Sequence, residues 1–82
     1  MSREKDLLDM LEIFTTAIEI HGREEDFFRR SSKASTHSAA KSLLLHIADD
    51  IGHYRRELEK HREEVKSELD SLETPGRKSL EH

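Results

Sequence analysis

The sequence predicts an all-α fold, an antiparallel hairpin of two long helices, from three observations. Apolar residues recur every three or four positions in both halves of the chain, the period of a helix with one buried side. A serine-rich stretch, residues 31–38, interrupts this period. No stretch alternates between apolar and polar residues as a strand does. We therefore expect one domain, residues 1–73, followed by a flexible tail, residues 74–82.

The first helix is expected at residues 3–30. Its apolar stripe continues through two polar residues that keep the spacing of three and four, and consists of Leu7, Leu11, Phe14, Ile18, His21, Glu25 and Phe28. Gly22 weakens this helix by about 1 kcal/mol relative to alanine. One side of the helix is predicted to face a partner helix.

The second helix is expected at residues 36–72, with Ser35 or Thr36 capping its N-terminus. Its stripe consists of Ala40, Leu43, Leu44, Ile47, Ile51, Tyr54, Leu58, His61, Val65 and Leu69. The helix ends before Thr74-Pro75-Gly76, a strong terminator. Residues 80–82 resemble the start of an expression tag and belong to the tail.

Composition limits the ways in which so small a chain can be stable. The 82 residues are 39% charged and 33% hydrophobic, and none is cysteine. Because short chains bury little apolar surface, they usually need a disulfide, a metal or a partner chain. The hairpin would leave apolar surface uncovered at the edges of the two stripes, at Leu8, Ile13, Ile20, Leu44 and Ile51. They predict a homodimer or larger homo-oligomer, in which two hairpins form a four-helix bundle.

Several classes of function are disfavoured. The formal net charge of −4 and the mixing of Arg and Lys with acids argue against nucleic-acid binding. No apolar run approaches the roughly 20 residues of a membrane span, and no secretory leader is visible, so a cytoplasmic location is expected. Nothing resembles a phosphate-binding loop or a catalytic nucleophile at motif spacing.

Two short patterns carry candidate metal ligands. His21 stands seven residues before Phe28, and Asp50 stands three residues before His53. Residues three apart lie on one side of a helix and can bind one ion together. Over residues 10–66 these patterns resemble the ferritin-like carboxylate proteins of the rubrerythrin type. In that family one helix contributes a Glu seven residues before an aromatic residue, and another helix contributes Glu-x-x-His. In this sequence His21 stands at the position of the first Glu, and Asp50 stands at the position of the Glu in Glu-x-x-His.

The resemblance implies a transition-metal site, with iron or zinc, at the interface of a homodimer. Two copies of His21, Asp50 and His53 would complete it, with the histidines as terminal ligands and Asp50 as the bridging carboxylate. Residues one turn away could add ligands or orient the imidazoles, and these are Glu25, His46 and Glu57. With two carboxylates in place of the family's four, we expect at most a weak ferroxidase or other oxidoreductase activity.

Two other interpretations fit the same residues. The fold could be kept without metal, as a helical bundle that serves as an assembly or protein-interaction module. His21 and Asp50 would then form a polar pair that fixes the register of the helices. The chain could also be a generic antiparallel coiled coil unrelated to that family. The aligned spacings favour the first two interpretations over the third.

Overall fold

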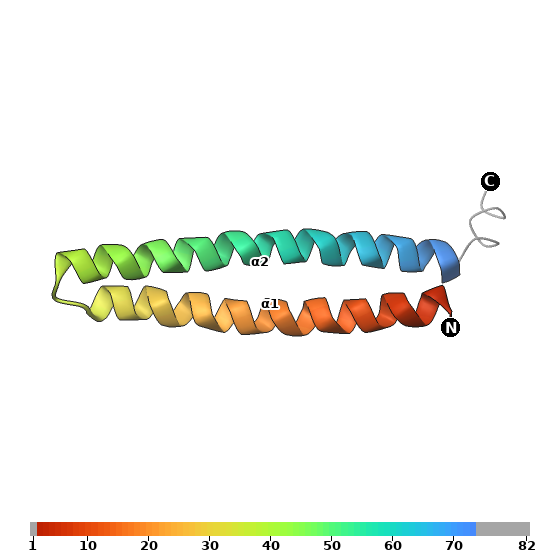
Figure 1. Ribbon diagram of the computed structural model, residues 1–82, viewed down its shortest axis with the longest axis horizontal. Coiled ribbons are helices and arrows are strands. Elements are labelled where there is room, and N and C mark those ends of the chain that lie inside the picture. The colour runs from red at the N-terminus through yellow and green to blue at the C-terminus, as the bar shows by residue number, and fades with distance from the viewer. Residues whose placement is uncertain (1, 74–82) are drawn as a thin grey trace.

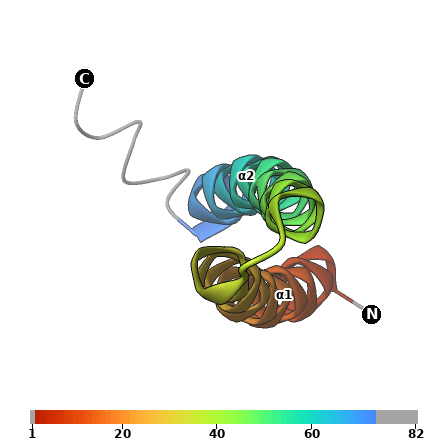
Figure 2. The same ribbon diagram turned by 90° about the vertical axis from the view of Figure 1, so that its left-hand side faces the viewer.

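The computed structural model describes residues 2–73 as two antiparallel helices. Helix α1 spans Arg3–Ala34 and helix α2 spans Ser38–Glu73. At about 1.5 Å per residue they are roughly 48 and 54 Å long. Figure 1 shows the helices side by side along their whole length, with the turn at one end and the N-terminus at the other. Figure 2, seen from the turn end, shows one pair of helices joined by the loop, so the predicted helical hairpin is confirmed.

The N-terminus of α1 is stabilised by a capping side chain and by acidic residues in its first turn. The side chain of Ser2 accepts a hydrogen bond of 3.1 Å from the backbone N–H of Lys5, one of the donors that the first helical turn leaves unpaired. Glu4 and Asp6 lie in that turn, where the helix dipole favours negative charge. These contacts fix where α1 begins at the open end of the hairpin, the end opposite the turn.

Helix α1 continues four residues beyond its predicted end, through residues 31–34. The reason lies in Ser32, which is buried between the helices. Its hydroxyl donates a hydrogen bond of 2.8 Å to the backbone carbonyl of Lys41 on α2. This contact satisfies the serine inside the hairpin, so the serine-rich stretch does not end the helix where its composition predicts.

The connection between the helices comprises residues 35–37. The carbonyl of His37 accepts a hydrogen bond of 2.9 Å from the N–H of Lys41, so His37 holds the N-terminal cap position of α2 that was expected for Ser35 or Thr36. Ser35 instead makes weak contacts of 3.4 Å to the backbone of His37 within the turn.

The buried apolar residues of the described chain are Leu7, Ile18, Ala48, Val65 and Leu69. Three of them, Leu7, Val65 and Leu69, form one cluster at the open end, with Leu11 and Phe14 packed against it. The main stripe of α1 is therefore the side that contacts α2, as its spacing predicts. The core is narrow because only one side of each helix is covered.

Two further predictions concern the C-terminal segment and the absence of a membrane-spanning stretch. The terminator Thr74-Pro75-Gly76 and the tag-like residues 80–82 lie outside the described residues. Within residues 2–73, neither helix contains an apolar stretch of the length needed to cross a membrane.

Candidate functional site

His21 lies at the edge of the interface between α1 and α2. Its Nδ1 is 2.7 Å from a carboxylate oxygen of Glu24, three residues later on the same helix. Its ring meets the ring of Tyr54 from α2 edge-on, with 5.1 Å between the ring centroids. The imidazole is thus held by a carboxylate on one side and an aromatic ring on the other.

Asp50 and His53 lie on α2 but point away from α1. Arg55 faces α1, and at about 100° per residue His53 points roughly 160° and Asp50 roughly 140° away from it around the helix axis. The carboxylate of Asp50 is 72% exposed and pairs with His46, 3.6 Å away. The structure therefore brings Asp50 together with His46, and it does not bring either to His21 within one chain.

No group of three or more His, Asp and Glu side chains in residues 2–73 is arranged to hold a metal ion. Glu57, like Asp50 and His53, is exposed on α2. A metal site built from His21, Asp50 and His53 would thus require side chains from a second chain.

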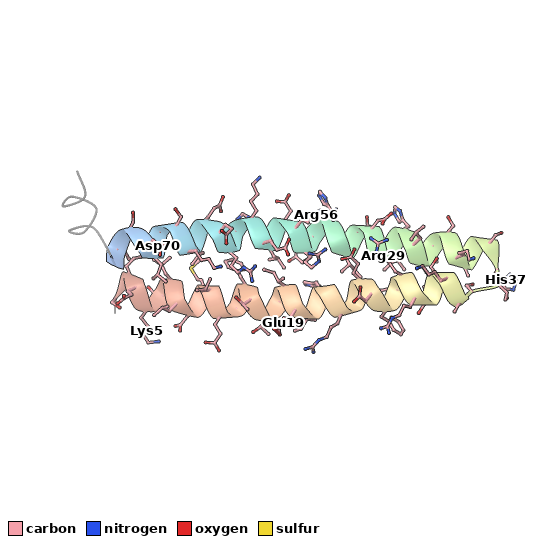
Figure 3. All side chains as sticks on the ribbon, turned by 180° about the vertical axis from the view of Figure 1, so that it is seen from behind. Lys5, Glu19, Arg29, His37, Arg56 and Asp70 are labelled. Carbon is pink, nitrogen blue, oxygen red and sulfur yellow. The ribbon has the colours of Figure 1, made fainter. Side chains whose placement is uncertain are left out.

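Glu25, expected to orient metal ligands, instead lies in an ionic cluster between the helices. Its carboxylate accepts hydrogen bonds from Arg29, at 2.7 Å, and from Arg55 of α2, at 3.0 Å, and its side chain is only 12% exposed. The hydrogen bond from Arg29 lowers the pKa of Glu25; burial opposes this effect and Arg55 adds to it. Figure 3 shows Arg29 between the helices, whereas Lys5 and Glu19 lie on the side of α1 away from α2.

The cluster extends over both helices and needs a glycine beside it. Arg29 also pairs with Asp49 at 3.1 Å, and Arg55 with Glu59 at 3.0 Å. Gly52 provides the space, because a Cβ atom there would lie 2.7 Å from a carboxylate oxygen of Glu25. Sequence reasoning missed these arginines, although the spacing of four between Glu25 and Arg29 signals a helical ion pair.

Five of the large apolar side chains that are exposed lie on one side of the hairpin, and they are Met10, Ile13, Ile20, Leu43 and Tyr54. We call this surface the apolar face, and it also includes the half-buried Ala17 on α1 and Ile47 and Ile51 on α2. On each helix these residues recur at steps of three or four, so each set shares one side of its helix, and the charged Asp50, four residues before Tyr54, lies on the same side of α2. The contact of His21, one turn after Ala17, with Tyr54 shows that the two sets lie on the same side of the hairpin.

The α1 part of the apolar face contains a shallow groove of about 550 Å³. Ile13, Ala17 and Ile20 line it together with the polar residues Asp9, Glu12 and Thr16. Ile13 is 65% exposed, and Leu43 and Tyr54 on α2 are more than half exposed. Exposed apolar side chains that lie close together are a common feature of interaction surfaces.

The opposite side of the hairpin is charged. Asp49, which pairs with Arg29, lies roughly 140° around α2 from Tyr54. The Arg29–Asp49 and Arg55–Glu59 ion pairs therefore occupy the side away from the apolar face. Each helix is apolar on two adjacent sides, one used within the hairpin and one uncovered.

Fold and surface together define a two-helix antiparallel hairpin with one uncovered apolar side. A scan against protein-family models and searches of curated proteins and of solved structures found no match to this chain.

Proposed function

We propose that this chain is an assembly module, in which two copies pack their apolar faces together as a homodimer and form a four-helix bundle. The observation that carries the proposal is the apolar face, where Ile13, Leu43 and Tyr54 are more than half exposed. Covering this surface removes apolar area from water, at roughly 25 cal/mol per Å². The hairpin alone gains little of this free energy.

A second copy is the occupant that the size of the hairpin favours. Its core contains only a few buried apolar residues, and small domains with little core are usually stabilised by a metal, a disulfide or oligomerisation. Cysteine is absent, and no metal-holding cluster exists in residues 2–73. Two-fold symmetry is the commonest symmetry of homo-oligomers, and it would pack the apolar face of one chain against the same face of the second chain.

The mass of tag-free protein in solution tests the proposal. Sedimentation equilibrium over micromolar concentrations is expected to give twice the 9.6 kDa mass of the chain. The midpoint of thermal unfolding should rise with protein concentration, since dissociation accompanies unfolding. A folded monomer whose melting midpoint does not depend on concentration would reject the homodimer.

Metal binding by a ferritin-like bundle is a separate hypothesis, supported by the resemblance of the His21 and Asp50-x-x-His53 patterns. It requires the dimer to bring these side chains together between chains. Calorimetric titration of tag-free protein with Zn²⁺, wild type against His53→Ala, tests it. Binding by the wild type that is lost in the variant supports the site, and equal binding by both, or none by either, rejects it.

A further inference from the structure

Arg62 is a half-buried arginine on α2 whose side chain is not fully satisfied within the chain. Its Nε atom is buried, and no hydrogen-bond acceptor in residues 2–73 lies within bonding distance of that atom. Nearly all buried donors in folded proteins have a partner, because leaving one unpaired destabilises the protein. Arg62 is therefore the place in the hairpin where an acceptor from outside the chain has most to contribute.

The packing around Arg55 repeats seven residues further along α2. The ring contact of His21 with Tyr54, at 5.1 Å, has a counterpart in the contact of Phe14 with His61, at 6.3 Å. Both partners of the second contact are displaced by seven residues, or two helical turns, from those of the first. Positions seven residues apart therefore have equivalent surroundings in this part of the hairpin, and Arg62 is the equivalent of Arg55.

The acceptors that hold Arg55 have no counterparts beside Arg62. The carboxylates that hold Arg55 come from two residues, each at 3.0 Å, and these are Glu25 and Glu59. Seven residues before the first of them stands the buried Ile18, and seven residues after the second stands Lys66. Arg62 is thus flanked by an apolar side chain and by a second cation, where Arg55 is flanked by two carboxylates.

A hydroxyl group joins these cations. Gly22 lies against Arg55, since a Cβ atom at Gly22 would lie 3.8 Å from the Cδ atom of Arg55. The equivalent neighbour of Arg62 is Thr15, which is half-buried on α1. A hydroxyl, a guanidinium and an ammonium group therefore come together from Thr15, Arg62 and Lys66. We call these three residues the donor site.

The donor site lies on the charged side of the hairpin, away from the apolar face. Arg62 occupies the same place around α2 as Arg55, whose ion pair with Glu59 lies on that side. The proposed homodimer leaves this side uncovered, so the site is open to solvent in a monomer and in a dimer alike. Binding at the donor site therefore does not depend on dimer formation.

Three carboxylates close to the donor site do not hold Arg62. On α2, Glu59 pairs with Arg55, and Glu63 pairs with Lys66 at 3.5 Å. On α1, Glu19 lies on the side away from α2 (Figure 3). Because both partners of the Glu63–Lys66 pair are more than half exposed, this pair adds little stability, and Lys66 is free to turn to a stronger acceptor.

We propose that the donor site binds a phosphate group. An arginine with an unpaired Nε binds two oxygens of one anion through Nε and Nη, the bidentate geometry that favours arginine at phosphate sites. A phosphate group has three strong acceptor oxygens and close to two negative charges at neutral pH, which match the three donors and two positive charges of the site. A carboxylate has only two oxygens and one charge, so it leaves one donor and one cation unmatched.

NMR of arginine side chains in the tag-free protein tests the site, with inorganic phosphate as the probe. At constant ionic strength, phosphate should shift the Nε–H signal of Arg62 in a saturable way, and acetate should shift it much less. The signal of Arg56, which is exposed on the same helix, is the control and should respond weakly to both anions. Capped phosphoserine is a second probe. Whichever of phosphoserine and free phosphate binds more tightly identifies the source of the group, provided that either one shifts the signal.

Three variants show which residues hold the phosphate, with backbone amide shifts as the readout. Thr15→Val keeps the shape of the side chain but removes the hydroxyl, and should weaken phosphate binding about fivefold. Arg62→Lys keeps the positive charge but loses the bidentate geometry, and should weaken binding about tenfold. Arg56→Lys is the matched control and should retain the wild-type affinity. Circular dichroism checks that all three variants stay helical.

The outcomes separate a phosphate site from a solvated arginine. A saturable, phosphate-selective shift of the Arg62 signal, weakened by Thr15→Val and by Arg62→Lys but not by Arg56→Lys, supports the inference. An Arg62 signal that neither phosphate nor phosphoserine shifts, or that acetate shifts equally, overturns it. Wild-type affinity in Thr15→Val and Arg62→Lys overturns it as well. None of these results depends on whether the chain is a monomer or a dimer.

Discussion

At the open end of the hairpin, Leu7, Val65 and Leu69 exclude water between the helices, whereas towards the turn the same interface contains Glu25 between Arg29 and Arg55. Apolar packing is strong but does not distinguish well between neighbouring registers. An ionic cluster adds little net stability, because desolvation offsets the attraction, but it penalises every register that leaves a charge unpaired. We therefore expect the open end to supply most of the stability and the turn end to fix how the helices align.

The largest effect is expected at the open end. Leu7→Ala removes a side chain that is 1% exposed and leaves a cavity beside Val65 and Leu69, which should cost about 3 kcal/mol in the free energy of unfolding. Leu8→Ala is the matched control, since Leu8 is 47% exposed and should cost only about 0.5 kcal/mol. Urea unfolding followed by circular dichroism measures both. Equal losses would show that the packing of Leu7 between the helices does not stabilise the hairpin.

A smaller effect is expected in the ionic cluster. Glu25→Gln should cost roughly 1–2 kcal/mol at neutral pH, because two arginines lose their shared charged acceptor while Asp49 and Glu59 remain as partners. The pKa of Glu25 is lowered by the hydrogen bond from Arg29, so its contribution is present above the ordinary value of 4.5 and is lost as pH falls through the lower, folded-state pKa. The difference between the two proteins should therefore shrink in acid. A difference that stays constant down to strongly acidic pH contradicts this role.

The smallest expected effect is a difference in stability between alanine substitutions at Gly22 and at Gly52, two glycines at the helix–helix interface. A Cβ atom at Gly22 would meet only the Cδ of Arg55, at 3.8 Å, so Gly22→Ala should stabilise the hairpin by about 1 kcal/mol through helix propensity. At Gly52 the same methyl group would displace the carboxylate of Glu25 from its arginines. Gly52→Ala should therefore give no net gain. If thermal unfolding shows equal stabilisation by both, Gly52 is not needed to seat Glu25.

The sequence predicts the helices well because their period depends on local spacing. Leu7, Ile18, Val65 and Leu69 were all placed on the predicted stripes, and the structure buries them. The stripe of the second helix was only partly right, since it included Leu43 and Tyr54, which are more than half exposed, and omitted the buried Ala48. The end of α1 was wrong by four residues, because the bond from Ser32 to Lys41 joins two elements whose register is not visible in either one. Contacts between residues of two different helices cannot be predicted from the spacing of residues within one helix.

The same limit applies to the candidate site. His21 was placed on the stripe of α1, and the structure puts it at the helix–helix interface, against Tyr54. The spacing of Asp50 and His53 showed that they share a side of α2, but not that this side points away from α1. Glu25 was interpreted as a helper of metal ligands, because its partner Arg55 lies thirty residues away in the sequence.

The comparison of Ile13→Glu with Leu8→Glu by sedimentation equilibrium tests the apolar face most directly. Both side chains are exposed on α1, but they point roughly 140° apart, and only Ile13 lines the groove of the apolar face. We expect Ile13→Glu to be a monomer, since the dimer would bury an unpaired charge, and Leu8→Glu to remain a dimer like the wild type. Circular dichroism checks that both variants stay helical. If the two variants have the same mass as each other, whether monomer or dimer, the apolar face is not the surface through which this chain assembles.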